Sequence, residues 1–193
     1  MQKKLLVKDI MIPLEQYATV PEDASLYDAI LALEEVLSCV KSAKDCHRAV
    51  LVVTRKGGHV IGKVSQLDVI RSLEPSYGHI LAGPAHGSGR VGFSNRFLKL
   101  LADDYKLWKE PLSDICARAR TIPVTRIMYA PSSESEYVHE KASLEEAIHQ
   151  LVMGHHQSLL VIRRGRISGI LRLTDVFFAV ARMVKEHGGE ARG

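Results

Sequence analysis

Long apolar runs and paired cysteines are missing from this sequence of 193 residues. The most apolar stretches, residues 49–53 and 159–162, are far shorter than the roughly 20 residues that cross a bilayer. The first residues lead into no secretory signal. The three cysteines have spacings typical of neither a disulfide framework nor a zinc site. We therefore expect a cytoplasmic protein with reduced thiols, no metal site and no membrane contact.

Aromatic residues are also scarce, at 6% of the chain, and long blocks of one charge are absent. Because the aromatic residues are not interleaved with Lys and Arg, a base-stacking surface and nucleic-acid binding are not expected. The formal charge is +4, with 26 basic and 22 acidic residues interspersed. This balance favours a small phosphate-bearing ligand. The hydrophobic content of 46% suffices for one substantial core, or for two small cores that share an interface.

What the sequence does contain is one pattern that occurs twice, on either side of a dissimilar middle segment. Apolar lead-ins stand at residues 7–11 and 124–128. After each lead-in, a serine stands where a helix N-cap is expected, at Ser25 and Ser143, with an acidic residue three positions later. The following residues carry one apolar stripe at helical spacing, so each copy is expected to bury one face of an amphipathic helix.

Each copy then continues with two strands and a second helix. Short β-branched runs followed by glycine-containing turns predict paired strands at residues 49–53 with 60–64, and 159–162 with 167–171. At the end of each copy a strand runs directly into a helix, at residues 62–68 and 169–175. The first copy is longer, and most of its extra residues lie in 38–45, which predict a helix extension or a loop.

The middle segment begins with residues 75–92, which are rich in Gly, Pro, Ser and His and predict a loop. Residues 94–108 predict a helix with an aromatic stripe, which needs a cover from the repeats or from another subunit. Pro111 opens a further short helix. The expected domains are residues 1–73 for the first repeat, 74–122 for the insert, 123–186 for the second repeat and 187–193 for a tail.

The two copies resemble the CBS domain family. The β-α-β-β-α unit of that family has an Asp-Ile-Met-like lead-in, found here at residues 9–11. It ends in Gly, two apolar residues, Ser or Thr, and Asp three positions later, as at residues 62–68; the second copy has Arg172 in place of the hydroxyl residue. The resemblance covers residues 3–73 and 123–185. It implies an α/β (α+β) fold in which two repeats pack as a pseudo-two-fold pair, with up to two clefts between them.

In that family the clefts hold adenosine-containing ligands, and occupancy regulates an attached or associated protein. The resemblance therefore implies a regulatory ligand, namely AMP, ADP, ATP or S-adenosylmethionine, with no catalytic cofactor and no catalytic residue. It also implies a homodimer and a separate effector protein. The alternative is a ligand-independent oligomerisation or scaffold protein of the same fold. An enzyme that uses the His- and Gly-rich insert ranks last.

The first copy offers residues that suit a ribose and a phosphate. Asp68, in the first turn of a helix, can accept hydrogen bonds from both ribose hydroxyls. Ser65, with the adjoining Val64, can meet a ribose or phosphate oxygen, although Ser65 and Asp68 are equally a capping box. His47 and Arg48 resemble the His-Arg pair of AMP-sensing kinase gamma subunits, in which the arginine holds phosphate. The alternative for Arg48 is a solvated charge at a strand end.

The second copy differs at the equivalent positions. Asp175, with the adjoining Thr174, lacks a good cap residue three positions before it, so its carboxylate is expected to serve something beyond capping. Arg172 could supply a positive charge to a ligand, and Gln157 takes the place of the arginine. Adenine is expected to rest on apolar segments of both lead-ins, where the candidates are Met11, Ile12, Met128 and Tyr129. Each of these residues could equally belong to the core. We therefore expect two non-equivalent clefts, with the first better suited to a nucleotide phosphate.

Two further motifs are not expected to be functional. Residues 87–92 match the Gly-x-Gly-x-x-Gly pattern of dinucleotide-binding proteins. No predicted strand precedes them, and no acidic residue follows at the required distance. His155 and His156 are adjacent and therefore point in different directions, so they do not predict a metal site.

Overall fold

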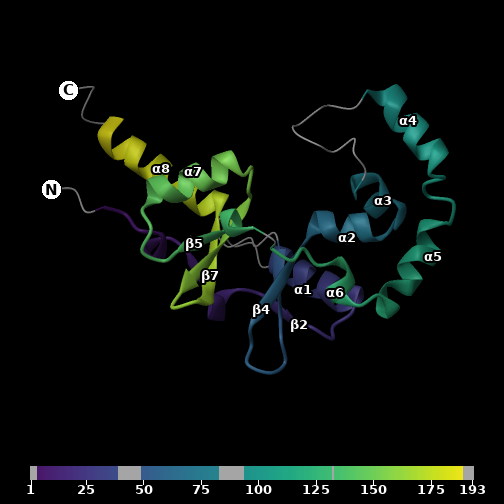
Figure 1. Cartoon of the computed structure of the whole chain (residues 1–193), viewed down its shortest axis with the longest axis horizontal. Helices are drawn as coiled ribbons and strands as arrows, with labels where there is room; N and C mark the ends of the chain where they lie inside the picture. The colour runs from purple at the N-terminus through teal and green to yellow at the C-terminus, as the bar shows by residue number, and fades with distance from the viewer. Residues whose placement is uncertain (1–3, 39–48, 83–93, 132, 189–193) are drawn as a thin grey trace.

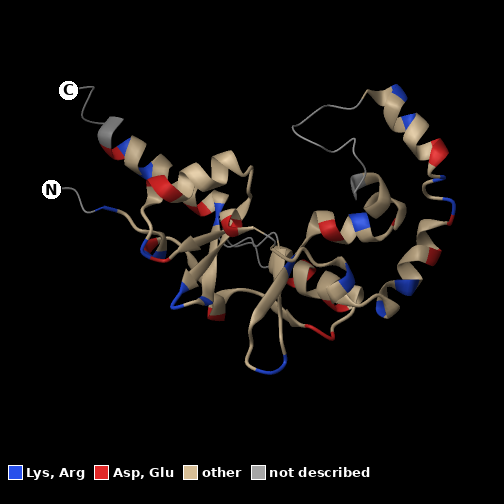
Figure 2. Ribbon diagram, viewed as in Figure 1, with Lys and Arg blue, Asp and Glu red and all other residues tan. Residues whose placement is uncertain are grey.

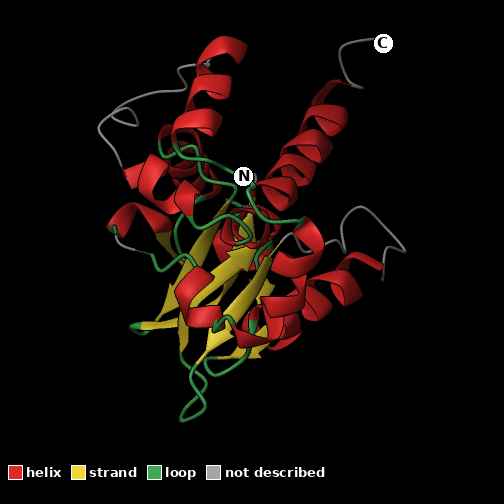
Figure 3. Cartoon of the chain, turned by 90° about the vertical axis from the view of Figure 1, so that its right-hand side faces the viewer, coloured by secondary structure: helices red, strands yellow, loops and turns green. Residues whose placement is uncertain are grey.

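The structure, a computed structural model, describes residues 4–38, 49–82, 94–131 and 133–188. Two small β-sheets lie at its centre with helices around them (Figure 1; Figure 3). The strands are β1 Ile12–Pro13, β2 Thr19–Pro21, β3 Ala49–Val53, β4 Val60–Ser65, β5 Tyr137–His139, β6 Ser158–Arg163 and β7 Arg166–Arg172. One sheet has the order β2-β3-β4 and the other the order β1-β7-β6-β5. The mixed α/β fold predicted from the sequence is confirmed.

The α-helices are α1 Leu26–Ser38, α2 Gln66–Ser72, α3 Ser76–Ala82, α4 Asn95–Asp104, α5 Leu112–Ala117, α6 Val124–Ile127, α7 Leu144–Met153 and α8 Leu173–Gly188. Short 3₁₀ helices lie at η1 Val7–Asp9, η2 Leu14–Gln16, η4 Arg118–Thr121 and η5 Glu134–Glu136. Within the described ranges, none of these helices has the length and apolar character needed to cross a membrane.

The predicted elements of the two repeats form at the predicted places. The β3 strand pairs antiparallel with β4, and β6 pairs antiparallel with β7. At the start of α1, the Ser25 N–H donates to Asp28 Oδ2 at 2.8 Å, and the Asp28 N–H donates to Ser25 Oγ at 3.2 Å. At the start of α7, the Glu146 N–H donates to Ser143 Oγ at 3.3 Å. These contacts are local in sequence, which is why the residue pattern was sufficient to place them.

The two lead-ins are exchanged between the repeats, which the sequence did not predict. The β1 strand of the first lead-in pairs with β7 of the second copy, with Ile12 opposite Ile170. In the other direction, Tyr129 and Lys63 exchange two backbone hydrogen bonds, at 2.8 and 3.0 Å, so the second lead-in pairs with β4. Each repeat is therefore completed by a segment of the other, and neither sheet packs alone.

The glycine of each terminal motif permits this exchange. A Cβ atom added at Gly62 would lie 2.7 Å from Met128 Sδ and 3.1 Å from the Tyr129 carbonyl oxygen. A Cβ atom added at Gly169 would collide with the backbone of Ile12. Because each lead-in runs so close to the strand, both positions require a residue without a side chain.

The core divides into three clusters of buried apolar residues. One cluster lies in the second copy and includes Val7 from the first lead-in, and another lies in the first copy and includes Val124 from the second lead-in. The third cluster joins the two sheets and consists of Tyr17, Leu51, Leu160 and Ile170. Because all three clusters combine residues of both repeats, the pair is expected to fold as one cooperative unit.

The insert differs from its prediction in its first part. A loop was expected at residues 75–92, but residues 76–82 form helix α3, while 83–92 lie outside the described residues. The reason lies in the two residues before the helix. The Glu74 carboxylate accepts the Ser76 N–H at 3.0 Å and so caps the helix, and Pro75 has a φ value that favours the helical conformation.

The helix predicted at 94–108 is also shorter than expected. Helix α4 ends at Asp104, and Lys106 and Trp108 adopt positive φ values of 51° and 56°. Trp108 turns back, because its backbone N–H donates to Glu74 Oε2 at 2.8 Å and its indole N–H donates to Tyr77 Oη at 3.3 Å. The rest of the aromatic stripe stays exposed in the structure as described, with Leu98 at 48%.

Candidate functional site

The junction of β4 and α2 holds the residues predicted for a ribose. Ser65 is the N-cap of α2: the Asp68 N–H donates to Ser65 Oγ at 3.3 Å. Asp68 Oδ2 accepts both the Ser65 N–H at 2.9 Å and the Ser65 hydroxyl at 2.6 Å. The capping box named as the alternative is therefore formed. It engages only Oδ2, and the nearest described cation to Oδ1 is Arg71 Nη1 at 3.9 Å.

The second lead-in brings two more predicted residues to this junction. Tyr129 is bonded through its backbone to β4, and its side chain is 41% exposed. Its hydroxyl donates to Glu136 Oε1 at 2.9 Å, and Glu136 is itself buried. Met128 lies against Gly62 and packs on the core of the first copy. Val64, in contrast, points its side chain fully into that core, so a ligand could reach only its backbone.

Lys63 belongs to the same junction and was missed from the sequence. Side chains alternate along a strand, so Lys63 and Ser65 lie on one face of β4 and the buried Val64 on the other. The Lys63 ammonium lies over the Tyr129 ring, 5.3 Å from its centroid. Burial lowers the pKa of Lys63 below its ordinary value, although the carboxylates of Glu136 and Asp68 act in the opposite direction. The available signal was a lysine at an apolar position of the terminal motif.

We call Lys63, Ser65, Asp68, Met128 and Tyr129 the first site. His47 and Arg48, also predicted for it, lie outside the described residues. The first site therefore combines a carboxylate, a hydroxyl, an ammonium group and an exposed aromatic ring, contributed by both repeats.

The junction of β7 and α8 is arranged differently. Arg172 forms a two-pronged ion pair with Asp175: Nε donates to Oδ2 at 2.6 Å and Nη2 donates to Oδ1 at 2.5 Å. The Arg172 residue is only 7% exposed and the Asp175 side chain 14% exposed. Asp175 was expected to do more than cap a helix. In the structure both of its oxygens bind the guanidinium group of Arg172, three residues earlier in the chain.

Tyr17, from the first copy, interacts electrostatically with this ion pair. Its side chain is buried, and that burial raises the pKa of Tyr17 to about 12. Arg172 lowers the pKa of the hydroxyl and Asp175 raises it, so both charges act on Tyr17. The sequence offered no signal for this neighbour, which lies far from Arg172 along the chain.

The remaining predicted residues of the second copy lie around the same junction. The Leu173 N–H donates to the Gln157 carbonyl oxygen at 2.9 Å, and Thr174 is half-buried in the first turn of α8. Ile12 packs on the cluster between the sheets, and Met11 packs on the core of the second copy. We call Ile12, Gln157, Arg172, Thr174 and Asp175 the second site.

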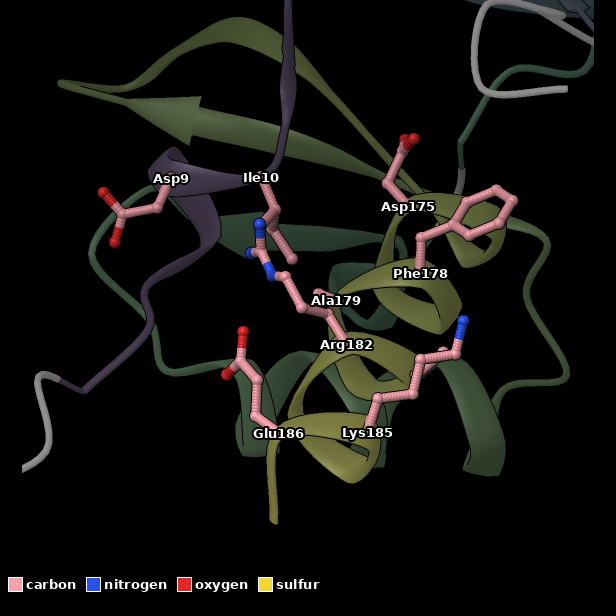
Figure 4. A pocket seen from close by; sticks show the side chains of 9 residues that line it. Asp9, Ile10, Asp175, Phe178, Ala179, Arg182, Lys185 and Glu186 are labelled. Atoms are coloured by element: carbon pink, nitrogen blue, oxygen red, sulfur yellow. The ribbon is translucent and has the colours of Figure 1, made fainter. Parts of the chain in front are cut away.

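A cavity of about 520 Å³ extends from Asp175 along α8. It lies between the first lead-in, at Asp9 and Ile10, and the helix face that ends at Glu186 (Figure 4). Its size suits a small molecule. Its charged lining mixes the cations Arg182 and Lys185 with carboxylates of Asp9, Asp175 and Glu186, which does not favour a polyphosphate.

Charges elsewhere do not mark a further site. Acidic and basic residues both occur on α2 and on α8 (Figure 2). Over the parts of the chain that are described, no group of three His, Cys, Asp or Glu side chains is placed to hold a metal ion.

Solved structures with the same fold were found. They include CBSX2 in complex with AMP (19% identity, TM-score 0.55, covering 93% of this chain and 98% of that one). They also include the CBS-pair protein CBSX2 from Arabidopsis thaliana (18%, 0.54, 95% and 99%). A third is the CBS domain of a bacterial CNNM/CorC family Mg²⁺ transporter in complex with ATP (14%, 0.56, 92% and 87%). No curated protein sequence matches significantly.

The family model described as CBS domain matches residues 7–75 and 124–182, which are the two copies of the sequence pattern. The resemblance inferred from the lead-ins and the terminal motifs is thereby confirmed. Because the model matches both copies and the fold agrees with CBS-pair structures, the chain belongs to the CBS domain family, as a tandem pair of CBS domains.

Proposed function

We propose that this protein is a regulatory module that binds an adenine nucleotide at its first site and signals occupancy to a partner protein. The observation that carries the proposal is that the strand leading to Asp68 in the first repeat pairs, at Lys63, with Tyr129 of the second repeat. A ligand held by both would favour one arrangement of the two repeats over others, which is how a bound ligand shifts a conformational equilibrium.

Asp68 suits a ribose because capping occupies only one of its oxygens. Oδ2 accepts the two bonds from Ser65, whereas Oδ1 has Arg71 at 3.9 Å as its described partner. A ribose hydroxyl can therefore donate to Oδ1 without breaking the cap. The capping role and the ligand role of Asp68 are compatible.

Tyr129 and Met128 suit the base. The Tyr129 ring is 41% exposed, and the face that Lys63 does not cover offers a flat surface on which a purine can stack, worth about 1–3 kcal/mol per base. The polarizable sulfur of Met128 lies next to it on the same lead-in and adapts to flat rings. His47 and Arg48 remain our candidates for holding the phosphate.

The second site suits a ribose less well. Both oxygens of Asp175 already bind Arg172, which is itself only 7% exposed. A ribose would have to displace a two-pronged charged pair, which the first site does not require.

Two structural neighbours support the choice of ligand class. The CBSX2 structure is a complex with AMP, and that of the CNNM/CorC domain is a complex with ATP. AMP, ADP, ATP and S-adenosylmethionine share the adenosine group that the first site would hold. We propose that this ligand is regulatory and that the protein is not an enzyme.

The output surface that we propose is formed by exposed apolar helix faces. Ile70 on α2 and Phe177 on α8 occupy equivalent positions of the two repeats and are 56% and 63% exposed. Exposed apolar groups of this kind commonly mark protein interfaces. We propose that these faces pair two chains into a homodimer, and that the exposed stripe of α4 contacts the effector protein.

Titration calorimetry with AMP, ADP, ATP and S-adenosylmethionine tests the function. We expect one site per chain and at least a tenfold loss of affinity in Asp68→Asn, which keeps the cap oxygen but weakens the ribose acceptor. Asp175→Asn is the matched control and should bind as the unsubstituted chain does. Absence of binding by all four ligands would favour the scaffold alternative, and turnover of a ligand would favour an enzyme. Loss of binding only in Asp175→Asn would move the site to the second junction.

A further inference from the structure

The two repeats also differ at one position between the sheets. Lys63 of β4 and Ile170 of β7 are equivalent, since each lies opposite the lead-in of the other repeat. Ile170 is fully buried in the cluster between the sheets, whereas Lys63 is half-buried at the corresponding place. The second copy shows that an apolar residue satisfies the fold here, so the charge of Lys63 calls for a separate explanation.

We propose that Lys63 determines the specificity of the first site by pairing with the phosphate next to the ribose, so that phosphorylated adenosine binds in preference to adenosine. This inference rests on the proposed function. It extends that function, because it assigns phosphate selection to a described residue that the terminal motif does not provide for.

The position of Lys63 on β4 supports this role. Lys63 and Ser65 lie on the same strand face, two residues and therefore about 7 Å apart along the backbone. Asp68 is bonded to Ser65, so the ribose acceptor lies at one end of this span and the lysine at the other. The span is comparable to the length of a ribose 5′-phosphate, and the flexible lysine stem can adjust to it.

The described groups around Lys63 compensate its charge only in part. The ammonium lies over the Tyr129 ring, and the nearby carboxylates of Glu136 and Asp68 act on it. Glu136 is bound to the Tyr129 hydroxyl and Asp68 to Ser65, so both carboxylates have other donors. These partners do not outweigh desolvation, because burial still holds the pKa of Lys63 below its ordinary value. A phosphate would supply the missing negative charge.

Affinities for adenosine and AMP, measured by calorimetry on the full chain, test the proposal. In Lys63→Met, the affinity for AMP should fall roughly tenfold to hundredfold, the range of a lost charge-assisted bond, while adenosine changes less than about twofold. Lys56→Met, at an exposed turn of the same repeat, is the control and should change neither. Lys63→Arg keeps the charge and should keep the preference for AMP even if Lys63→Met folds poorly.

Equal losses of affinity for adenosine and AMP in Lys63→Met would overturn this inference but not the proposed function. They would mean that the lysine contacts the base or supports the packing of the sheets. Unchanged AMP affinity in that variant would also overturn it. Absence of AMP binding by the unsubstituted chain would overturn the proposed function and this inference with it.

Discussion

The two repeats share one motif and one topology, yet their strand-to-helix junctions contain different chemistry. In the first repeat a serine caps the helix and engages one oxygen of Asp68, and the other oxygen lies 3.9 Å from Arg71 Nη1. In the second repeat an arginine takes the place of that serine and binds both oxygens of Asp175. One substitution thus converts a candidate ligand acceptor into half of a buried ion pair. Aspartates at equivalent positions therefore differ, because capping engages one oxygen of Asp68, whereas Asp175 uses both oxygens in an ion pair.

The largest expected effect concerns the ion pair. Arg172→Met should lower the free energy of unfolding by about 3 kcal/mol, because it leaves the carboxylate of Asp175 buried without its partner. Ser65→Ala, the equivalent change in the first repeat, removes one cap and should cost about 1 kcal/mol. Urea unfolding of both variants measures the difference. Equal losses would contradict the assignment of different roles to the two junctions.

The second prediction compares the two glycines beneath the exchanged lead-ins. In Gly169→Ala the new methyl group meets the backbone of Ile12, which cannot move aside, so we expect a loss of about 2–3 kcal/mol. In Gly62→Ala it meets mainly the flexible Met128 side chain, so about 1 kcal/mol is expected. Thermal unfolding orders the two variants. If Gly62→Ala were the more damaging, the second lead-in would be held more rigidly than the first.

The third prediction concerns the stability of the protein at alkaline pH, where Tyr17, the neighbour of the second site, loses its proton. The unfolded chain loses the Tyr17 proton near pH 10, whereas the folded chain holds it to about pH 12. The folded state therefore binds more protons in this window, and stability falls as pH rises through it, by about 2.7 kcal/mol in total. Tyr17→Phe should remove this part of the alkaline loss, and Tyr105→Phe, at the exposed residue that follows α4, should not. Identical pH profiles for Tyr17→Phe and the unsubstituted chain would contradict the burial of this hydroxyl.

The smallest expected effect concerns the ends of the two terminal helices. Helix α2 stops at Ser72, and Glu74 fastens the insert there through the N–H groups of Ser76 and Trp108, whereas α8 continues to Gly188. Burial acts to raise the pKa of Glu74, but these donors bring it below its ordinary value. Glu74→Gln should therefore cost about 1 kcal/mol at neutral pH. Its effect should vanish in acid, as the unsubstituted carboxyl takes up its proton. Glu110→Gln, on an exposed ion pair, is the control with no measurable change.

Much of the fold could be predicted because its signals are local. Short apolar β-branched runs located β3, β4, β6 and β7 but not the short strands β1, β2 and β5, and Ser25, Ser65 and Ser143 each precede a helix. The insert was harder. Helix α3 depends on a carboxylate cap that was read as part of a loop. The end of α4 depends on Trp108, whose N–H groups find partners about 30 residues earlier in the chain.

The candidate sites were predictable only in part. Ser65, Asp68 and Asp175 follow from the spacing of the terminal motif, and the pairing of Tyr129 with the first repeat follows only from the exchanged lead-ins. Arg172 was expected to face a ligand, yet in the structure it binds its own aspartate. Lys63 was overlooked because a single lysine at an apolar strand position indicates a site only once its neighbour Tyr129, from the other repeat, is known.

The sequence by itself determined the two repeats, their helix caps, their strands and the family to which they belong, because these properties depend on residues a few positions apart. The tertiary structure alone decided which lead-in completes which repeat and therefore which side chains share a site. It also decided which aspartate keeps an oxygen available. These outcomes depend on contacts between residues far apart in the chain, such as Lys63 with Tyr129, 66 positions apart, and Ile12 with Ile170, 158 positions apart. Such contacts form only when the two sheets pack against each other.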